Sequence, residues 1–501
     1  MLYEEIMMDN PTLAKYYLFQ YLSSQEPEVI QVNAVAERFQ HTYQQTYNLL
    51  TEIDFELGQL DAGQAPLLIR NGRIDLRKLH VTLDEYRYAL LLESLPFQFV
   101  LYLLHNEKGT IEDFCQQNFV SRSTVNRKLK KINQYLADYG MRFSYNPVDL
   151  LGDERMIRIT LFYFTWLGTR GVAWPFSIPK EQVYPLADHY IRYFSMANSF
   201  MGRQELLYFA TIFELRISQN HLVAYDHKFD FLLEDTPYFD MTSLNDYKGL
   251  SAEEAKGESS FIYFLAHFAP YFTTNKDPLL QDTLANFARK PNVVWDFSKA
   301  FFDFVETSVL TPDQLAAERE LLLGNLLNIT LAFYIFENRF PNMHSLMLRP
   351  RPQSNSTRHL QQLVLGFFED KLAQEAFQVY RKPAEQMCKS YRNLLSPYYF
   401  ALPFNSKLNV ALALEHNHLI VVTLVNLLED LSFTEIFEYD PEEVEHYDLI
   451  ISTSQQLRKE HPQIPFIIWN FNDQDTEVLE LYQKLRNLYI QKNRVDRTLE
   501  F

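Results

Sequence analysis

Apolar residues recur along the chain with the spacing of amphipathic helices, and the pattern is clearest at the end of the first third. A helix is predicted over residues 111–119, with Thr110 as its N-terminal cap. Its apolar face carries Ile111, Phe114 and Cys115. After a short turn, in which Ser121 or Ser123 is placed to act as a cap, a second helix is predicted over residues 124–139. Its buried positions are Val125, Leu129, Ile132 and Leu136, and the two helices together predict a helix-turn-helix (HTH) unit.

The same pattern occurs 79 residues earlier in the chain, as the offset between Thr46 and Val125 shows (125 − 46 = 79). The matching positions are Val32, Val35 and Ala36 in the first helix and Thr46, Leu50 and Ile53 in the second. A β-hairpin about Asn71-Gly72, a favoured type I′ turn, is predicted within residues 67–76. A hairpin directly after an HTH forms a wing, so a winged helix is predicted here. Residues 142–147 predict a second wing after the later HTH.

Helical patterns continue from residue 160 to about 395 and divide into two repeats. The first repeat runs from residues 204–217 to residues 261–272, with an acidic, irregular insertion around residues 234–258. The second repeat starts near Pro278. Its predicted helices cover residues 321–336, 360–372 and 384–394. The polar run over residues 349–357 is predicted as a loop, and His344 and His359 also lie in loop-like sequence.

From about residue 396 short apolar runs alternate with helical stretches. Buried strands are predicted over residues 408–414, 448–453 and 465–469, and helices over 419–431 and 476–491. This alternation predicts a parallel α/β sheet. The predicted fold class is therefore mainly α and multidomain, with a winged helix and a second HTH, two helical bundles and a C-terminal α/β domain.

Composition predicts a soluble and mainly helical chain. It is 47% hydrophobic and 15% aromatic, yet it contains only 13 glycines, few for an enzyme with phosphate-binding loops. Cys115 and Cys388 are too far apart in sequence to indicate a disulfide framework or a metal site. No apolar run approaches the ~18–20 residues that cross a bilayer, and the first residues, Met1-Leu-Tyr-Glu-Glu, lack the basic and apolar regions expected of a signal peptide. A cytoplasmic protein without a membrane segment is expected.

The net charge of −18 argues against non-specific coating of nucleic acid, so the location of the positive charge matters. Residues 120–137 contain five basic residues and no acidic residue. Arginine suits guanine, and lysine suits phosphate. The predicted DNA-binding residues of the second HTH are Ser121, Arg122, Ser123, Thr124, Asn126, Arg127, Lys128, Lys130 and Lys131. The alternative is an ordinary helical hairpin with a solvated basic face.

The first HTH offers amides where the second offers cations. Its predicted DNA-binding residues are Gln44, Gln45 and Asn48, together with Arg70 and Arg73 in the wing. Glutamine and asparagine suit adenine. Because three acidic residues follow (Glu52, Asp54 and Glu56), weak contact with phosphates is predicted. An HTH that serves only packing is the alternative.

The order of these motifs resembles the Mga/AtxA family, which are virulence and global regulators of Gram-positive bacteria. The resemblance rests on the sequence Val120-Ser-Arg-Ser-Thr-Val125 and on Leu151-Gly-Asp-Glu-Arg-Met-Ile-Arg158. The second stretch is similar to the junction that leads into a phosphotransferase-system regulation domain (PRD). The resemblance implies a winged helix over residues 1–78, a second HTH over 79–159, PRD-like domains over 160–276 and 277–395, and an enzyme IIB-like domain over 396–501.

PRDs accept phosphate on histidines from carriers of the sugar phosphotransferase system, and a neutral imidazole is a suitable acceptor. The resemblance implies His189, His221, His227 and His267 as candidates, with His221 and His267 best placed. The second repeat has Leu326-Leu-Asn where PRDs often have Leu-Leu-His, which favours a role in dimerisation. Enzyme IIB carries a phosphoryl cysteine where this chain has residues 414–418 (Leu-Glu-His-Asn-His), which implies an interaction module.

Together these features predict a DNA-binding transcription regulator that is not an enzyme and needs no cofactor. The expected partners are double-stranded DNA, a second copy of the chain in a homodimer, and phosphocarrier proteins. The alternatives are a scaffold linked to the phosphotransferase system, an RNA-binding antiterminator and an enzyme of that system. The missing cysteine counts against the enzyme, and the duplicated HTH with its basic residues favours DNA over RNA.

Overall fold

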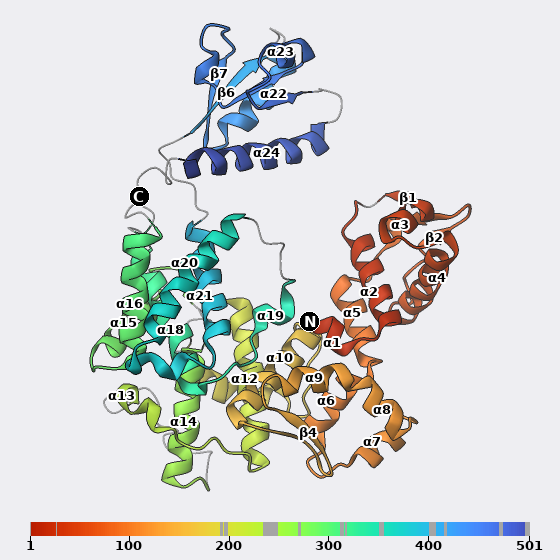
Figure 1. The fold of residues 1–501 in the computed structure, drawn as a ribbon. Coiled ribbons are helices and arrows are strands. Elements are labelled where there is room, and N and C mark those ends of the chain that lie inside the picture. The colour runs from red at the N-terminus through yellow and green to blue at the C-terminus, as the bar shows by residue number, and fades with distance from the viewer. Residues whose placement is uncertain are drawn as a thin grey trace. The chain divides into compact units, whose positions relative to one another are not determined.

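The computed structural model describes residues 2–26, 28–190, 194, 199–233, 249–268, 272–310, 315, 318–349, 355–399, 407–414, 418–469 and 474–495 of the chain. These residues are mainly helical and form two compact parts, Met1–Ser396 and Pro397–Phe501, shown in Figure 1. We call the first part the N-terminal body and the second part the C-terminal domain.

The N-terminal body begins with a winged helix. Its elements are α1 (Tyr3–Met7), α2 (Asn10–Ser23), β1 (Val29–Gln31), α3 (Val32–Phe39), α4 (Tyr43–Leu60), β2 (Leu68–Ile69) and β3 (Arg73–Asp75). The three strands form an antiparallel sheet in the order β1-β3-β2. Asn71 and Gly72 have φ angles of 66° and 65° between β2 and β3, which is the geometry of a type I′ turn. The predicted first wing is confirmed, and we call α3, α4 and this sheet the first HTH.

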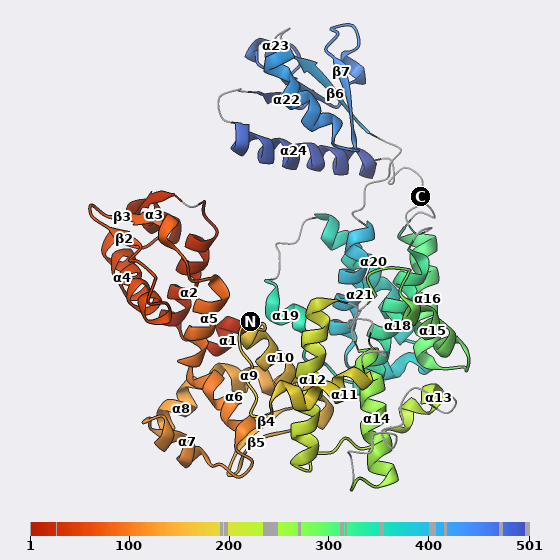
Figure 2. The same cartoon turned by 180° about the vertical axis from the view of Figure 1, so that it is seen from behind.

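The second HTH follows. Its elements are η1 (Leu76–Lys78), α5 (Leu83–Leu92), α6 (Leu95–His105), α7 (Ile111–Gln117), α8 (Arg122–Lys128), α9 (Lys130–Ala137), β4 (Arg142–Tyr145) and β5 (Val148–Leu151). Figures 1 and 2 show α7 and α8 lying together, near the hairpin that β4 and β5 form. Strands β4 and β5 pair antiparallel, so the second wing is confirmed and extends beyond Pro147.

The predicted single helix over residues 124–139 is wrong in two respects. Because Ser121 is the cap that accepts a hydrogen bond from the Thr124 backbone N–H, the helix begins at Arg122. The chain also leaves helical geometry at Leu129, where φ is −76° and ψ is −2°, and resumes as α9. The Leu129 side chain is fully buried, so the break keeps this position in the core.

A helical region completes the N-terminal body. Its elements are α10 (Glu154–Thr169), α11 (Lys180–Tyr190), α12 (Phe200–Ser218), η4 (His227–Phe229), α13 (Asp230–Leu233), α14 (Ala252–Ala266), α15 (Pro278–Ala288), α16 (Val293–Ser308), α18 (Arg319–Phe336), α19 (Met343–Met347), α20 (Asn355–Leu372), η6 (Glu375–Tyr380) and α21 (Ala384–Tyr399). α10 packs against the second HTH through α5, α6 and β5, and against α12 in the helical region.

Three expectations for the helical region are wrong. Part of the predicted acidic insertion is helix, because Ser251 caps α14 and Glu258 is fully buried within it. His344 lies in α19, where Asn342 is the cap, and His359 lies in α20. The end of the polar run that was predicted as a loop also belongs to α20. Residues 234–248 and 350–354 lie outside the described residues.

Within the described residues, one helix is long and apolar enough to cross a membrane by length and composition, namely α18. The bent pair of α5 and α6 passes the same test when the two are taken together. In α18, 78% of the apolar window is buried inside the structure, and the helix packs against α15 and α16. This burial is what we expect of the central helix of a bundle.

The C-terminal domain is a four-stranded parallel sheet in the order β7-β6-β8-β9, as predicted from the alternation of strands and helices. Its elements are β6 (Leu408–Ala413), α22 (His418–Glu429), β7 (Thr434–Glu438), η7 (Val444–His446), β8 (Leu449–Ser452), α23 (Gln455–Glu460), β9 (Phe466–Ile468) and α24 (Gln474–Val495). α22 and α24 contribute to the core on one face, and α23 contributes on the other.

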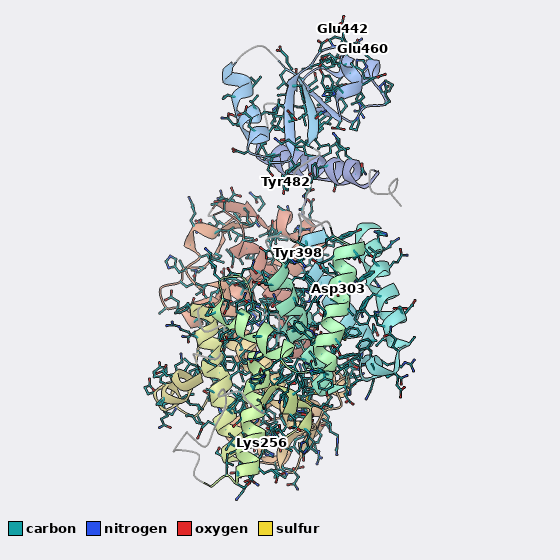
Figure 3. The ribbon with its side chains drawn as sticks, turned by 90° about the vertical axis from the view of Figure 1, so that its left-hand side faces the viewer. Lys256, Asp303, Tyr398, Glu442, Glu460 and Tyr482 are labelled. Atoms are coloured by element: carbon teal, nitrogen blue, oxygen red, sulfur yellow. The ribbon has the colours of Figure 1, made fainter. Side chains whose placement is uncertain are left out.

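Strand β7 and helix α23 were not predicted from the sequence. In Figure 3, Tyr482 on α24 lies on one side of the sheet, and Glu442 and Glu460 lie at the far end. Residues 415–417, which belong to the loop compared with enzyme IIB, lie outside the described residues.

Candidate nucleic-acid interface

The two HTH units are related by the same 79-residue offset in backbone detail as well as in sequence pattern. The turn residues Gln40 and Phe119 both adopt left-handed geometry, with φ angles of 56° and 53° (119 − 40 = 79). The caps Thr42 and Ser121 both accept a hydrogen bond from the backbone three residues later (121 − 42 = 79). Helices α4 and α8 therefore occupy equivalent places, which in an HTH is the place of the helix that enters the major groove.

The apolar positions that define the repeat are buried in both units. The residues concerned are Val32, Val35, Ala36, Thr46, Leu50 and Ile53 in the first HTH and Ile111, Phe114, Val125, Leu129 and Ile132 in the second. Cys115 is the exception, because it is only partly buried. The periodicity thus identified the core of each unit and, by exclusion, the faces of α4 and α8 that point to solvent.

Several predicted DNA-binding residues of the second HTH are accessible. Asn126, Arg127 and Lys130 are exposed, and Lys131 is half-buried. Over the part of the chain that the structure describes, Arg127, Lys130 and Lys131 form no ion pair, and Arg142 is exposed at the start of the second wing. These cations are available to an anionic partner. Ser121 and Thr124 also serve the cap, and the exposed Ser123 hydroxyl shares a hydrogen bond with the Ser121 hydroxyl.

Two other predicted cations already have partners. Arg122 lies 2.7 Å from a carboxylate oxygen of Glu112, and both side chains are exposed, so this pair is weak. Lys128 donates to Asp9, which caps α2 through the Thr12 backbone N–H. Partial burial would raise the pKa of Asp9, but hydrogen bonds from Lys128 and Thr12 outweigh it and lower that pKa to about 2. Lys128 is therefore held by a charged carboxylate that lies 119 residues away in sequence.

The first HTH presents amides and aromatic rings. Gln45 completes the cap of α4 by accepting the Thr42 backbone N–H, so this predicted DNA-binding residue has a structural role. The Gln44 side chain donates to the Asn48 side chain at 2.8 Å, and both are exposed. Arg70 and Arg73 are exposed on either side of the wing tip. All five predicted DNA-binding residues of the first HTH are exposed, three on α4 and two beside the tip of the wing.

Sequence reasoning missed Tyr43 and Tyr47 on the same face of α4. Their exposed fractions are 43% and 39%, and their rings stack with centroids 6.0 Å apart. They stand at the positions that Arg122 and Asn126 occupy in α8 (122 − 43 = 79 and 126 − 47 = 79). The offset between the two units was the signal that would have identified them.

The acidic residues of α4 mostly serve the fold. Asp54 accepts the backbone N–H groups of Leu67 and Leu68 at 2.8 and 2.9 Å, which fixes the start of the wing. Burial raises the pKa of Asp54 despite these bonds. Glu56 pairs with Lys15 and accepts the Tyr86 hydroxyl, and the exposed Glu52 lies 4.0 Å from the same lysine.

The second wing is tied to the helical region by buried charges. Asp149 of β5 accepts from Arg216 of α12 at 2.9 Å and lies 3.2 Å from His221 Nε2. Arg216 is 1% exposed and also binds Glu154 of α10 at 2.7 Å. Burial would lower the pKa of Arg216, but the hydrogen bonds that it donates to the carboxylates of Glu154 and Asp149 outweigh burial and raise that pKa, so the guanidinium stays charged.

A second buried arginine extends this network. Arg158 of α10 binds Glu258 of α14 at 2.6 Å, with exposed fractions of 1% and 0%, and donates to the His221 carbonyl at 2.7 Å. Glu258 also accepts the Val223 backbone N–H. The junction motif at residues 151–158 therefore joins the second wing, α10, α12 and α14. Buried charges are tolerated only when they are paired and hydrogen-bonded in this way.

The candidate histidines lie in different environments. His221 is 35% exposed beside Asp149, and His227 is 86% exposed beside Asp230. His267 is largely buried, with its ring nitrogens near the Tyr263 carbonyl and the Thr283 hydroxyl, and burial lowers its pKa to about 4. The side chain of His189 lies outside the described residues. Of the three that are described, His221 alone touches the second HTH.

The chain is similar to known proteins, and a match to a known family falls on the second HTH. The Mga helix-turn-helix domain matches residues 80–166, which contain α5 to α9, the second wing and most of α10. This match covers the second HTH and supports the resemblance of the chain to Mga/AtxA-type regulators.

Two relatives are capsule synthesis positive regulators of Bacillus anthracis. AcpA is 22% identical to this chain over 263 residues, which cover 50% of this chain and 52% of AcpA. AcpB is 24% identical over 155 residues, which cover 31% of this chain and 32% of AcpB. The chain thus spans about half the length of one relative and a third of the other.

Proposed function

We propose that this protein is a transcription regulator that binds double-stranded DNA, and that its second HTH supplies most of the electrostatic affinity. The observation that carries the proposal is the group of accessible cations on α8 and α9 of a chain whose net charge is −18. Phosphate contacts give most of the affinity of such proteins, and contacts to base edges give the sequence preference. RNA binding would use the same charges but lacks a second supporting observation.

The accessible side chains divide between these two tasks. Arg127 and Asn126 lie on α8, where they suit guanine and adenine, together with Ser123. Lys130, Lys131 and Arg142 lie beyond α8 and suit phosphates. Arg122 needs only to leave a weak surface pair, whereas Lys128 must leave Asp9 before it can bind DNA.

The remaining regions serve assembly and control in this proposal. In this proposal residues 160–276 and 277–395 are two PRD-like domains, and the C-terminal domain is an enzyme IIB-like domain without the phosphoryl cysteine. A homodimer in the cytoplasm would place two pairs of HTH units on one DNA site, which multiplies affinity. The names of both relatives favour activation of transcription as the outcome of binding.

His221 is the histidine that we propose as the phosphate acceptor. It is accessible, and a phosphate on Nε2 would bring negative charge against Asp149 of the second wing. The repulsion would weaken the contact between the wing and α12, which links a phosphocarrier to DNA binding. Incubation with phosphocarriers should label the wild type and the His267→Ala variant but not the His221→Ala variant. Equal labelling of both variants would move the site to another histidine.

The experiment that tests DNA binding compares Arg127→Ala with Arg289→Ala on duplex DNA from the promoter region of the protein's own gene. Both residues are exposed arginines, but Arg289 lies at the end of α15 in the helical region. Loss of one guanidinium that reads a base should cost about 1–3 kcal/mol, a weakening of roughly 5- to 150-fold. Arg289→Ala should bind as the wild type does. Equal binding by both variants would remove α8 from the interface.

A further inference from the structure

The solvent face of α4 exposes two aromatic rings that contribute little to the core of the protein. Tyr43 and Tyr47 are exposed by 43% and 39%, and their planes differ by only 22°. They lie one helical turn apart, at the positions where α8 carries Arg122 and Asn126. This face of α4 occupies the place where an HTH contacts base edges, so we ask which bases its exposed rings could recognise.

The residues that α4 lacks restrict what it can recognise. No lysine or arginine occurs between Tyr43 and Leu60, so the usual bidentate contact of a cation with guanine is not available to this helix. The face instead offers the amides of Gln44 and Asn48. Their mutual hydrogen bond uses one N–H of Gln44 and the oxygen of Asn48. It leaves the Gln44 oxygen as an acceptor and the Asn48 amide as a donor, which complement N6 and N7 of adenine.

Aromatic rings add a second contact with the same base pair. Thymine carries a C5-methyl group in the major groove, and apolar side chains recognise it by direct contact. Adenine and thymine are paired, so amides that bind adenine and rings that touch the thymine methyl select the same base pair. Both chemistries occur within the first two turns of α4.

The first wing supports this face from one side. A Cβ atom on Gly72 would lie 2.6 Å from the Tyr43 hydroxyl oxygen, so the tip of the wing is seated against Tyr43. Gly72 has a φ of +65°, which a residue with a side chain rarely adopts. Arg70 and Arg73 are exposed on either side of this tip. The wing thus limits the movement of Tyr43 and places two cations where a DNA backbone would pass.

We infer that the first HTH recognises A·T base pairs, with Tyr43 and Tyr47 contacting thymine methyl groups and the Gln44–Asn48 pair contacting adenine. This inference rests on the proposed function, because it assumes that the chain binds duplex DNA. It assigns recognition of A·T base pairs to a helix without cations and leaves most of the phosphate affinity to the second HTH.

The test replaces thymine by uracil throughout the promoter duplex, which removes the C5-methyl groups and preserves base pairing. Burial of one methyl group corresponds to about a 4-fold change in affinity, so two contacts should weaken wild-type binding by roughly 15-fold. The Tyr43→Ser/Tyr47→Ser variant should bind both duplexes equally, whereas Tyr43→Phe keeps the ring and should retain the preference. Circular dichroism establishes that each variant is folded.

Arg127→Ala separates this inference from the proposed function. It should bind more weakly to both duplexes and keep the wild-type ratio between thymine and uracil. Equal binding of both duplexes by the wild type, or a full preference in the double tyrosine variant, would overturn the inference while leaving DNA binding intact. Failure of the folded wild type to bind either duplex would overturn the proposed function and this inference with it.

Discussion

The first and second HTH units place α4 and α8 in equivalent positions, yet α4 has no basic residue and α8 has three, Arg122, Arg127 and Lys128. The shared geometry depends on a buried stripe, a left-handed turn residue and a capping hydroxyl. None of these restricts the side chains on the solvent face. The same HTH backbone can therefore occur twice in one chain, and the solvent faces of α4 and α8 can carry different side chains without a change in the fold.

The two wings differ in how they are anchored. Asp54 of α4 holds the first wing through the backbone of Leu67 and Leu68, so that wing depends on its own unit. Asp149 of β5 connects the second wing to Arg216 and His221 of the helical region. The second unit is thus the more basic one, and its wing is the one that is connected to the helical region.

The largest expected effect is on the stability of the fold, and it comes from breaking the buried pair of Arg158 and Glu258. Glu258→Gln removes a charge that faces Arg158, and one partner left alone in a buried pair costs about 3–5 kcal/mol. We expect a loss of stability at the lower end of this range, because Arg158 keeps a second carboxylate partner, Glu154, at 3.0 Å. Urea unfolding measures the loss. Replacing both residues by methionine should cost less than Glu258→Gln alone, and an equal or larger loss would show that the pair is not the cause.

A smaller and local effect separates the wings. Asp54→Ala leaves two backbone N–H groups without their acceptor, at about 1–3 kcal/mol for buried groups, and should speed hydrogen exchange in β2 and β3. Asp149→Ala should instead speed exchange in β5 and at the end of α12. Faster exchange in both wings for either variant would contradict independent anchoring.

The smallest expected effect concerns Lys128. Asp9→Asn removes the carboxylate that holds this lysine, and asparagine remains a good cap for α2. The freed lysine should add up to one phosphate contact, so the slope of log affinity against log salt should steepen by about 0.9. Asp84→Asn, which changes an exposed aspartate on α5, is the matched control. An unchanged slope for Asp9→Asn would show that Lys128 does not face DNA.

Periodicity predicted the features that are local in sequence. The stripe from Val125 to Leu136, the type I′ turn at Asn71-Gly72 and the parallel sheet of the C-terminal domain follow from spacing and turn chemistry. The partners of charged side chains were not predictable in this way, since Lys128 meets Asp9 across 119 residues and Arg158 meets Glu258 across 100. The burial of Glu258 in α14 was missed for the same reason, because its partner Arg158 lies 100 residues away in the sequence.

The most direct test of the account compares matched positions of the two units by salt titration of DNA binding. Lys130 and Lys131 correspond to Thr51 and Glu52 at the 79-residue offset (130 − 51 = 79). The Lys130→Ala/Lys131→Ala variant should reduce the slope of log affinity against log salt by about 1.8, since each phosphate contact contributes about 0.9. The Thr51→Ala/Glu52→Ala variant should leave the slope unchanged. A wild-type slope in the lysine variant, or an equal reduction in both variants, would contradict the claim that the second HTH supplies the electrostatic affinity.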